Sequence, residues 1–245
     1  MKPTHIMWGV AALLAVGIGI TFLIPPKNER IYVGSPLDPN LGVVDPTAVK
    51  DPPIHNQEDH PVTSDMTAAA DSLESIKAPA FDLPSVEGPN YSLKQLTDGK
   101  PLLIFFIEKE CPCCLGAKFF VDKMIDLYGD SISAVGIINA EIGVAKAWKK
   151  ATKPRFTVLM DPKQEVISAY KAERGVYTTV IGPDGMISKA YPGYSLDTLK
   201  EMSQRIAKLA GVPAKEFKSK AAPERLTSGC IFPDLAAEGG DKKSS

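Results

Sequence analysis

The stretch "FFIEKECPCCLGAKFF" (Phe105–Phe120) places three of the four cysteines of the chain within four positions. An apolar run precedes the cysteines, and apolar residues recur at helical spacing after them, which predicts a strand leading directly into a helix. Pro112 suits the first turn of that helix because proline lacks the N–H group that would be unpaired there. Cys111 is then the residue that caps the helix, and Cys114 lies inside its first turn.

The chemistry of thiols suggests a use for this arrangement. Only the thiolate is a good nucleophile, and the unpaired N–H groups and the dipole at a helix start favour a thiolate. Two cysteines in a Cys-x-x-Cys spacing at such a start can close a disulfide within one turn. We therefore expect Cys111 to attack and Cys114 to resolve. Cys113 receives no definite role, because a disulfide with its neighbour Cys114 would need a distorted peptide.

The charged neighbours of the cysteines act in both directions. Lys109 favours a thiolate at Cys111, whereas Glu108 and Glu110 oppose it. The sequence therefore leaves the pKa of Cys111 open. Small buried cysteines without any reaction are the structural alternative, which three thiols in four positions at this junction disfavour.

Short apolar segments alternate with helical patterns around this stretch. The sequence predicts a small hairpin from "APAFDL" and "NYSL", and buried strands at "PLLIFFIE", "ISAVGIINA" and "FTVLMD". "EIGVAKAWKKAT" and "EVISAYKA" are helical, and two strands surround a Pro-Asp-Gly turn in "YTTVIGPDGMISKAYPGY". An amphipathic helix then begins after Ser195 and ends at Gly211. This order predicts one α/β domain over residues 78–211, with a mixed sheet flanked by helices.

These segments, above all "LLIFFIEKECPCC" and "FTVLMDPKQEVISAYKAERGVYTTVIGPDGMI", resemble the thioredoxin-like redoxin family. That group includes peroxiredoxin relatives, of the alkyl hydroperoxide reductase and thiol-specific antioxidant type, and membrane-tethered thiol–disulfide oxidoreductases. The resemblance covers about residues 78–211. It implies a thioredoxin-like fold and dithiol chemistry at Cys111 and Cys114, with disulfides or thiols of proteins or small molecules as substrates. We expect no cofactor.

Two positions depart from the patterns of that family. A cis-proline normally faces the dithiol, just before a strand such as "TTVIGPDG". Here Val176 or Tyr177 holds that place, and because a cis bond before another residue is costly, we expect a trans loop with altered substrate contacts. Peroxiredoxins also place a threonine three residues before the reactive cysteine and a proline four residues before the threonine. For Cys111 these places hold Glu108 and Ile104, which weakens the peroxidase interpretation.

The chain before the domain divides into two parts. Residues 1–24 contain the uncharged apolar run "IMWGVAALLAVGIGITFLI" (Ile6–Ile24), which is long enough to cross a bilayer as a helix. No suitable small-residue cleavage site follows, so we expect an uncleaved transmembrane anchor. Residues 25–77 are rich in Pro, Asp and Asn, which predicts an extended tether, with a short helix at "SDMTAAADSLESIK" that leads into the domain. We expect the domain to be exported, to the periplasm or another extracytoplasmic face.

Residues 212–245 form a polar tail with one apolar island, "LTSGCIFPDL", which contains Cys230. Such an island usually docks on another surface, and we expect it to lie near the cysteine cluster. Once Cys111 and Cys114 are paired, Cys113 and Cys230 are left over. A Cys113–Cys230 disulfide, an attack of Cys230 on the active-site disulfide, and a free cysteine without a role all remain open.

Composition excludes one class of function and leaves others open. The net charge of −1 provides no basic excess for nucleic acid. The leading interpretation is a membrane-anchored, exported thiol–disulfide oxidoreductase. A thiol peroxidase that resolves through Cys114 or Cys230 is the alternative within redox chemistry, and a Cu(I)- or Zn(II)-binding thiolate site is the alternative from another class. No histidine follows His60, so the predicted domain itself supplies no imidazole for a metal.

Overall fold

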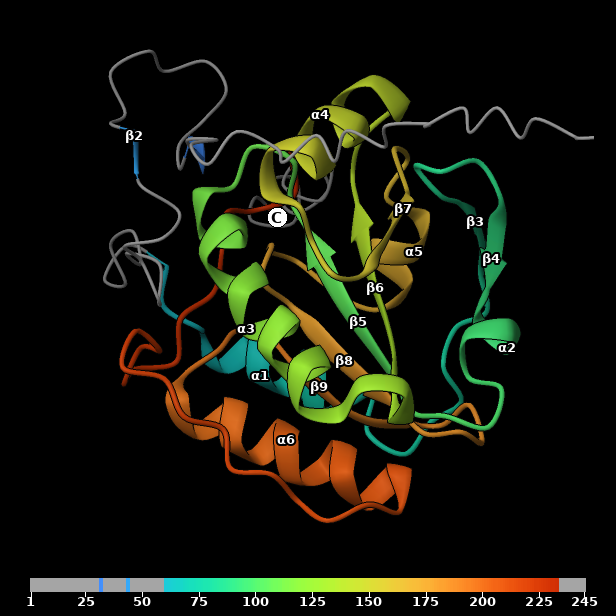
Figure 1. Cartoon of the computed structure of the whole chain (residues 1–245), viewed down its shortest axis with the longest axis vertical. Helices are drawn as coiled ribbons and strands as arrows, with labels where there is room; N and C mark the ends of the chain where they lie inside the picture. The colour runs from blue at the N-terminus through green and yellow to red at the C-terminus, as the bar shows by residue number, and fades with distance from the viewer. Residues whose placement is uncertain (1–30, 33–42, 45–59, 234–245) are drawn as a thin grey trace, which may run out of the picture.

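The computed structural model describes residues 31–32, 43–44 and 60–233 (Figure 1). The elements are β1 Ile31–Tyr32, β2 Val43–Val44, α1 Ser64–Asp71, β3 Asp82–Pro84, β4 Asn90–Ser92, α2 Leu93–Leu96, β5 Leu102–Ile107, α3 Pro112–Tyr128, the 3-10 turn Gly129–Ser131, β6 Ser133–Ile138, α4 Ile142–Thr152, β7 Thr157–Met160, α5 Glu165–Ala169, β8 Thr178–Ile181, β9 Ile187–Tyr191 and α6 Leu196–Ala210. Two short antiparallel pairs, β1 with β2 and β3 with β4, lie outside the main sheet.

The main sheet has five strands in the order β7-β6-β5-β8-β9. β5 runs parallel to β6 and antiparallel to β8, so that Ile104 lies opposite Val135 on one side and Thr179 on the other. All six residues of β5 are buried, as expected for a central strand that is covered on both faces. The predicted mixed α/β sheet is therefore confirmed.

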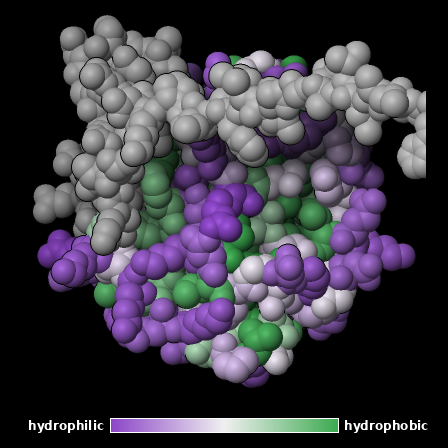
Figure 2. Space-filling model, viewed as in Figure 1, coloured by the Kyte–Doolittle hydropathy of each residue, from purple (hydrophilic) through white to green (hydrophobic). Residues whose placement is uncertain are grey.

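Alternate side chains of β5 divide the core into two halves. Leu103, Phe105 and Ile107 pack with buried residues of α3, α4 and α6. Leu102, Ile104 and Phe106 point the other way and pack with buried residues from α1 and α5. Because successive side chains of a strand point to opposite faces, one continuous apolar strand fills both layers. Figure 1 shows α3 and α6 side by side across one face of the sheet, and Figure 2 shows hydrophilic residues interspersed with hydrophobic patches on the outside of that face.

The folded unit begins earlier in the chain than predicted. Residues 60–77 were assigned to the tether, but α1 lies within them and packs on β9. The Thr63 hydroxyl accepts a hydrogen bond from the N–H group of Met66 at 3.2 Å and caps the helix. Met66, Ala70 and Leu73 are buried. These residues follow one another at helical spacing, but two alanine-rich turns make the pattern weak.

The tail also packs against the domain. Phe217 and Phe232, which lie in the predicted tail, are buried, and Phe217 packs edge-on against Phe120 of α3. The predicted docking of the tail is confirmed, and the contacts near the cysteines are described below.

The predicted anchor, residues 1–24, lies outside the described residues, as does the tether as far as residue 59 apart from β1 and β2. Among the residues that the structure describes, no helix is both long and apolar enough to cross a membrane.

Candidate active site

Cys111 lies at the junction of β5 and α3, as predicted. It has an extended backbone (φ −78°, ψ 112°) and caps α3, with Pro112 as the first helical residue. The N–H group of Cys114 donates to the carbonyl oxygen of Cys111 at 3.1 Å, which closes the first turn. The turn brings the second cysteine of the motif back towards the first.

The sulfur of Cys111 is the acceptor at the centre of the site. The thiols of Cys113, Cys114 and Cys230 all hydrogen-bond to it, and the backbone N–H of Cys230 donates to it at 3.1 Å. These bonds, first that of Cys113 and then those of Cys114 and Cys230, hold the pKa of Cys111 far below its usual range, despite burial. Cys111 is therefore the thiolate of the cluster, and the four cysteines are free thiols in this structure.

Cys114 is held as a neutral thiol. Its exposed fraction is 0 %, and burial raises its pKa well above the usual range, with further contributions from its hydrogen bond to Cys111 and from the charge there. Gly175 packs directly on it, since a Cβ atom at that residue would lie 2.7 Å from the Cys114 sulfur. A thiol of this kind attacks only after it has lost its proton. Cys114 therefore suits the second step of a disulfide exchange, the attack on a disulfide that Cys111 has already formed.

Cys113 and Cys230 complete the cluster. The Cys113 thiol bonds to Cys111 and Cys230, and these bonds, followed by burial, raise its pKa. The pKa of Cys230 is raised to about 12, chiefly by its bond to Cys111. Three neutral thiols therefore surround one thiolate.

The loop that replaces the cis-proline brings one of its two predicted residues to the site. Val176 lies in the apolar cluster that contains Cys111 and Cys114, and its backbone hydrogen-bonds to the Cys114 sulfur. Tyr177 points to the opposite face of the sheet, where its ring meets that of Phe106 edge-on with the centroids 5.8 Å apart. Tyr177 is therefore not part of the site, because successive residues alternate between faces.

Val176 also has an unusual backbone conformation. All peptide bonds of the described residues are trans, as expected for this loop, but Val176 has φ 68°. A β-branched residue rarely adopts this left-handed conformation, and it costs of the order of 1–3 kcal/mol. The surrounding contacts stabilise it: the N–H group of Val176 donates to the carbonyl oxygen of Phe106, and that of Phe106 to the carbonyl oxygen of Tyr177.

Two residues of the site, His60 and Tyr194, were not predicted from the sequence as parts of it, and Glu108 was considered there for its charge. The imidazole Nε2 of His60 lies 3.9 Å from the Cys230 sulfur. The hydroxyl of Tyr194 is buried without a hydrogen-bond partner, and its pKa is raised by burial and then by the charges of the cysteines. Glu108 is buried too, and burial raises its pKa before the charge of Cys111 adds to the effect. Neither His60 nor Tyr194 lies at a spacing that links it to the motif, whereas Glu108 lies three residues before Cys111.

His60 changes the premise of the metal argument. The sequence placed every histidine outside the domain, whereas the structure brings His60 to the tail cysteine. Within the described part of the chain, no three histidine, cysteine or acidic side chains are arranged to hold a metal ion.

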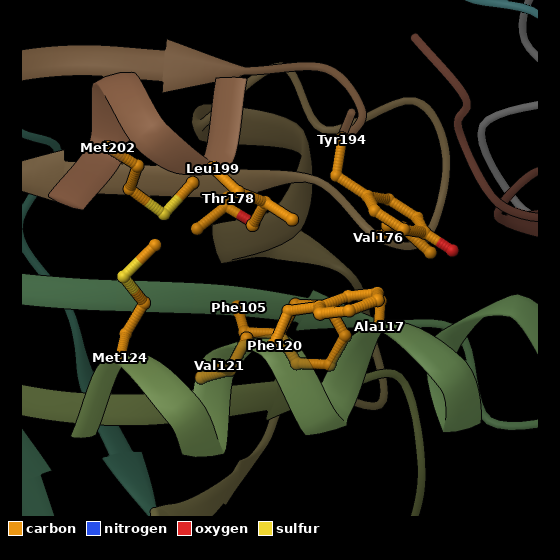
Figure 3. Close-up of a pocket in the computed structure, with 10 residues that line it drawn as sticks. All are labelled: Phe105, Ala117, Phe120, Val121, Met124, Val176, Thr178, Tyr194, Leu199 and Met202. Atoms are coloured by element: carbon orange, nitrogen blue, oxygen red, sulfur yellow. The ribbon is translucent and has the colours of Figure 1, made fainter. Parts of the chain in front are cut away.

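A small apolar cavity lies behind the site, between α3, α6 and the sheet (Figure 3). Its volume is about 10 Å³, which is room for about one water molecule. Figure 3 shows Tyr194 and Val176 at one end of it and Met124 and Met202 at the other. Its apolar lining and small size make it a packing defect of the core rather than a substrate pocket.

A mixed sheet with a cysteine at the start of the helix after its central strand is the arrangement of a thioredoxin-like redox protein. Residues 75–190 match the AhpC/TSA family. A protein of Mycobacterium tuberculosis that is assigned as a peroxiredoxin is 30 % identical over 135 residues, which is 50 % of this chain and 86 % of that protein. A peroxiredoxin assignment from Coxiella burnetii, bcp, is 28 % identical over 134 residues, or 49 % of this chain and 89 % of that protein. The chain belongs to the AhpC/TSA family of thioredoxin-like redoxins.

Solved structures show the same fold. One assigned as a thiol:disulfide interchange protein DsbE from Chlorobium tepidum superposes with a TM-score of 0.52 at 21 % identity, over 56 % of this chain and 98 % of that one. A second structure, assigned as a protein disulfide isomerase from Bacteroides thetaiotaomicron, superposes with a TM-score of 0.52 at 21 % identity, over 56 % of this chain and 90 % of that one. At this identity the likeness concerns the fold.

Proposed function

We propose that this redoxin is a thiol–disulfide oxidoreductase in which Cys111 attacks and Cys114 resolves. The observation that carries the proposal is the sulfur of Cys111, which lies at the start of α3 and accepts hydrogen bonds from three thiols and one backbone N–H group. Such an environment stabilises a thiolate, which is the reactive form.

The reaction follows thiol–disulfide exchange. The Cys111 thiolate attacks one sulfur of a substrate disulfide, which releases one substrate thiolate and leaves a mixed disulfide on Cys111. Cys114 then loses its proton and attacks the Cys111 sulfur, so that the second substrate thiolate leaves and a Cys111–Cys114 disulfide forms. Two electrons pass to the substrate. One of its thiolates takes up the proton that Cys114 releases, and the other stays a thiolate or takes up a proton from water. The reverse sequence oxidises a substrate dithiol.

Replacing the two cysteines separately tests this assignment. We expect Cys111→Ser to abolish turnover of a disulfide substrate, and Cys114→Ser to accumulate a mixed disulfide on Cys111. Both are measured by turnover assays and by non-reducing electrophoresis. Full turnover by the Cys111→Ser protein would rule out the proposed function. The reduction potential of the wild-type pair then gives the direction: a value near about −270 mV indicates a reductant, and one near about −120 mV an oxidant.

Peroxide reduction is the second candidate, because the relatives from Coxiella burnetii and Mycobacterium tuberculosis are assigned as peroxiredoxins. The residues near Cys111 argue against it. The places of the activating threonine and proline hold Glu108 and Ile104, and Ile104 is buried inside β5. Comparing hydrogen peroxide with a disulfide as the oxidant of the reduced protein decides between them: much faster oxidation by peroxide would favour the peroxidase.

We further propose that residues 1–24 anchor the protein in a membrane and that the domain is exported, where it meets protein or small-molecule disulfides and thiols. The uncharged run Ile6–Ile24 supports an anchor. The full-length chain should fractionate with membranes and begin at Met1, and protease added outside the cytoplasmic membrane should digest the domain. A mature chain that begins within residues 25–59 would show cleavage instead.

A further inference from the structure

The C-terminal segment Thr227–Phe232, called the strap below, lies across the cysteine cluster as an extended chain. Backbone hydrogen bonds hold it along its length, among them two pairs: Thr227 exchanges bonds with Tyr194 at 2.8 and 3.0 Å, and Gly175 donates to Cys230 at 2.8 Å while Gly229 donates to Gly175 at 2.9 Å. Phe232 is fully buried at its end. The strap is therefore paired on both sides of Cys230 and holds that residue in one place.

Glycines make this close approach possible. A Cβ atom at Gly229 would lie 2.7 Å from the carbonyl oxygen of Gly175, and one at Gly193 would lie 2.4 Å from that of Thr227. Both contacts are with backbone atoms, which cannot turn away as a flexible side chain can. The strap thus fits only while these positions lack side chains.

The pairing directs Cys230 at the reactive sulfur. Its N–H group donates to the Cys111 sulfur at 3.1 Å, and its thiol bonds to the same sulfur. Cys230 is only partly buried, whereas Cys114 is fully buried and packed under Gly175. Of the three residues whose thiols bond to Cys111, Cys230 is thus the one that is partly exposed, and it lies in the C-terminal segment.

We propose that Cys230 is a further catalytic thiol, which attacks Cys111 and forms a Cys111–Cys230 disulfide during turnover. The inference rests on the proposed function, because it needs a Cys111 that reacts with a disulfide substrate. In the mixed disulfide between Cys111 and the substrate, the Cys230 thiol loses its proton and attacks the Cys111 sulfur. The new S–S bond forms, the Cys111–substrate bond breaks, and the substrate leaves as a thiolate that takes up a proton.

No external oxidant or reductant is needed for this step. Cys230 is then, besides Cys114, a second thiol that can resolve the mixed disulfide on Cys111. The same attack on an oxidised Cys111–Cys114 pair would release Cys114 as a thiol and pass the disulfide to the tail. In both cases the strap must be docked at the moment the bond forms, after any opening that admits the substrate, since its backbone pairing sets the approach of Cys230 to Cys111.

A protein that retains only Cys111 and Cys230 tests the proposal. In the Cys113→Ser/Cys114→Ser variant treated with glutathione disulfide, we expect a transient glutathione adduct, followed by a monomer in which the Cys111 and Cys230 peptides are linked. The matched control also carries Cys230→Ser and should keep its adduct. The products are identified by intact mass and by non-reducing peptide mapping.

The outcomes separate the two proposals. A stable adduct in both variants would overturn the role of Cys230 and leave the reactivity of Cys111 intact. If no adduct forms in either variant, Cys111 is unreactive, and the proposed function fails together with the inference.

A substitution outside the cysteines gives a second test in the same two-thiol background. Gly229→Ala should slow formation of the Cys111–Cys230 disulfide several-fold, because the added Cβ displaces the strap. The control is Gly143→Ala in α4, where an added Cβ meets nothing within 4 Å, and it should leave the rate unchanged. Equal rates in Gly229→Ala and the control would contradict a role for the docked strap.

Discussion

At the scale of single residues, the site sets two opposing effects on Cys111 against each other. Hydrogen bonds from thiols and from the N–H group of Cys230 favour its thiolate. Glu108 opposes it, since this carboxyl is buried, and the charge of Cys111 contributes to raising its pKa. Because the coupling of two charges is mutual, an ionised Glu108 raises the pKa of Cys111 in turn.

Replacing Glu108 by Gln should therefore lower the pKa of Cys111. The measurement is the first thiolate step in an ultraviolet pH titration, which belongs to Cys111 because the other three thiols have raised pKa values. Glu110→Gln is the matched control: this side chain is exposed, so water screens its charge and the step should move less. A larger shift in the control would contradict the argument.

The same carboxyl makes stability depend on pH. Because the pKa of Glu108 is raised in the folded protein, the folded chain keeps a proton that the unfolded chain has already lost at pH values between the two pKa values. The free energy of unfolding therefore falls as pH rises through this window. The Glu108→Gln protein should lack the part of this decrease in the free energy of unfolding that is due to Glu108. Denaturant titrations of both proteins at several pH values measure the difference.

At the scale of elements, α1 shows that the folded unit includes chain before the predicted domain. The helix begins after a Thr63 cap and places Met66 and Ala70 in contact with the core. It lies along β9, at the edge of the sheet farthest from β7. A helix that covers an edge strand also prevents that strand from pairing with other chains.

Met66→Ala should lower the free energy of unfolding by about 2–5 kcal/mol, the usual cost of truncating a buried methionine. Ser64→Ala, at an exposed position of the same helix, should change it by less than about 0.5 kcal/mol. Denaturant unfolding of both variants measures the difference. Equal, small effects would mean that α1 contributes nothing to the folded unit.

At the scale of the whole molecule, the tail closes the site that the domain builds. The exposed fraction of Cys111 is 2 %, so a bulky disulfide reaches its sulfur only when the strap moves aside. Backbone bonds to Tyr194, His60, Gly175 and Glu173 hold the strap, and Thr227, Ser228 and Phe232 within it are buried, so moving it aside requires local opening of this segment.

Removing the tail should therefore expose Cys111 selectively to large reagents. The test uses a chain in which the other three cysteines are serine, and compares the rates at which a polymer-linked maleimide and a small maleimide label Cys111. Truncation after residue 222 should raise the ratio of the first rate to the second several-fold. The ratio corrects for any change in the pKa of Cys111. The control ends at residue 233, which keeps the strap, and should match the full-length chain; an unchanged ratio after residue 222 would show that the strap does not cover the site.

Much of the fold followed from local patterns in the sequence. The unbroken apolar run of β5, the proline after Cys111 and the spacing of the apolar residues of α3 each depend on near neighbours, so the strand, the cap and the helix could be predicted. The amphipathic helix α6, with its Ser195 cap and Gly211 end, was predicted for the same reason and is present. The short helix at α1 was predicted too, but it was counted with the tether because its alanines gave little apolar contrast that would indicate packing on the domain.

The sequence by itself determined the family, the mixed sheet and the place of Cys111 at a helix start, because periodicity, capping and the Cys-x-x-Cys spacing act over short distances. Only the tertiary structure decided the rest of the site. It brought His60 and Cys230 together across 170 positions, turned Tyr177 away while keeping Val176, and passed the strap against Gly175 and Gly193. These contacts depend on how close two backbones can approach, and that distance is set by packing between segments far apart in the chain.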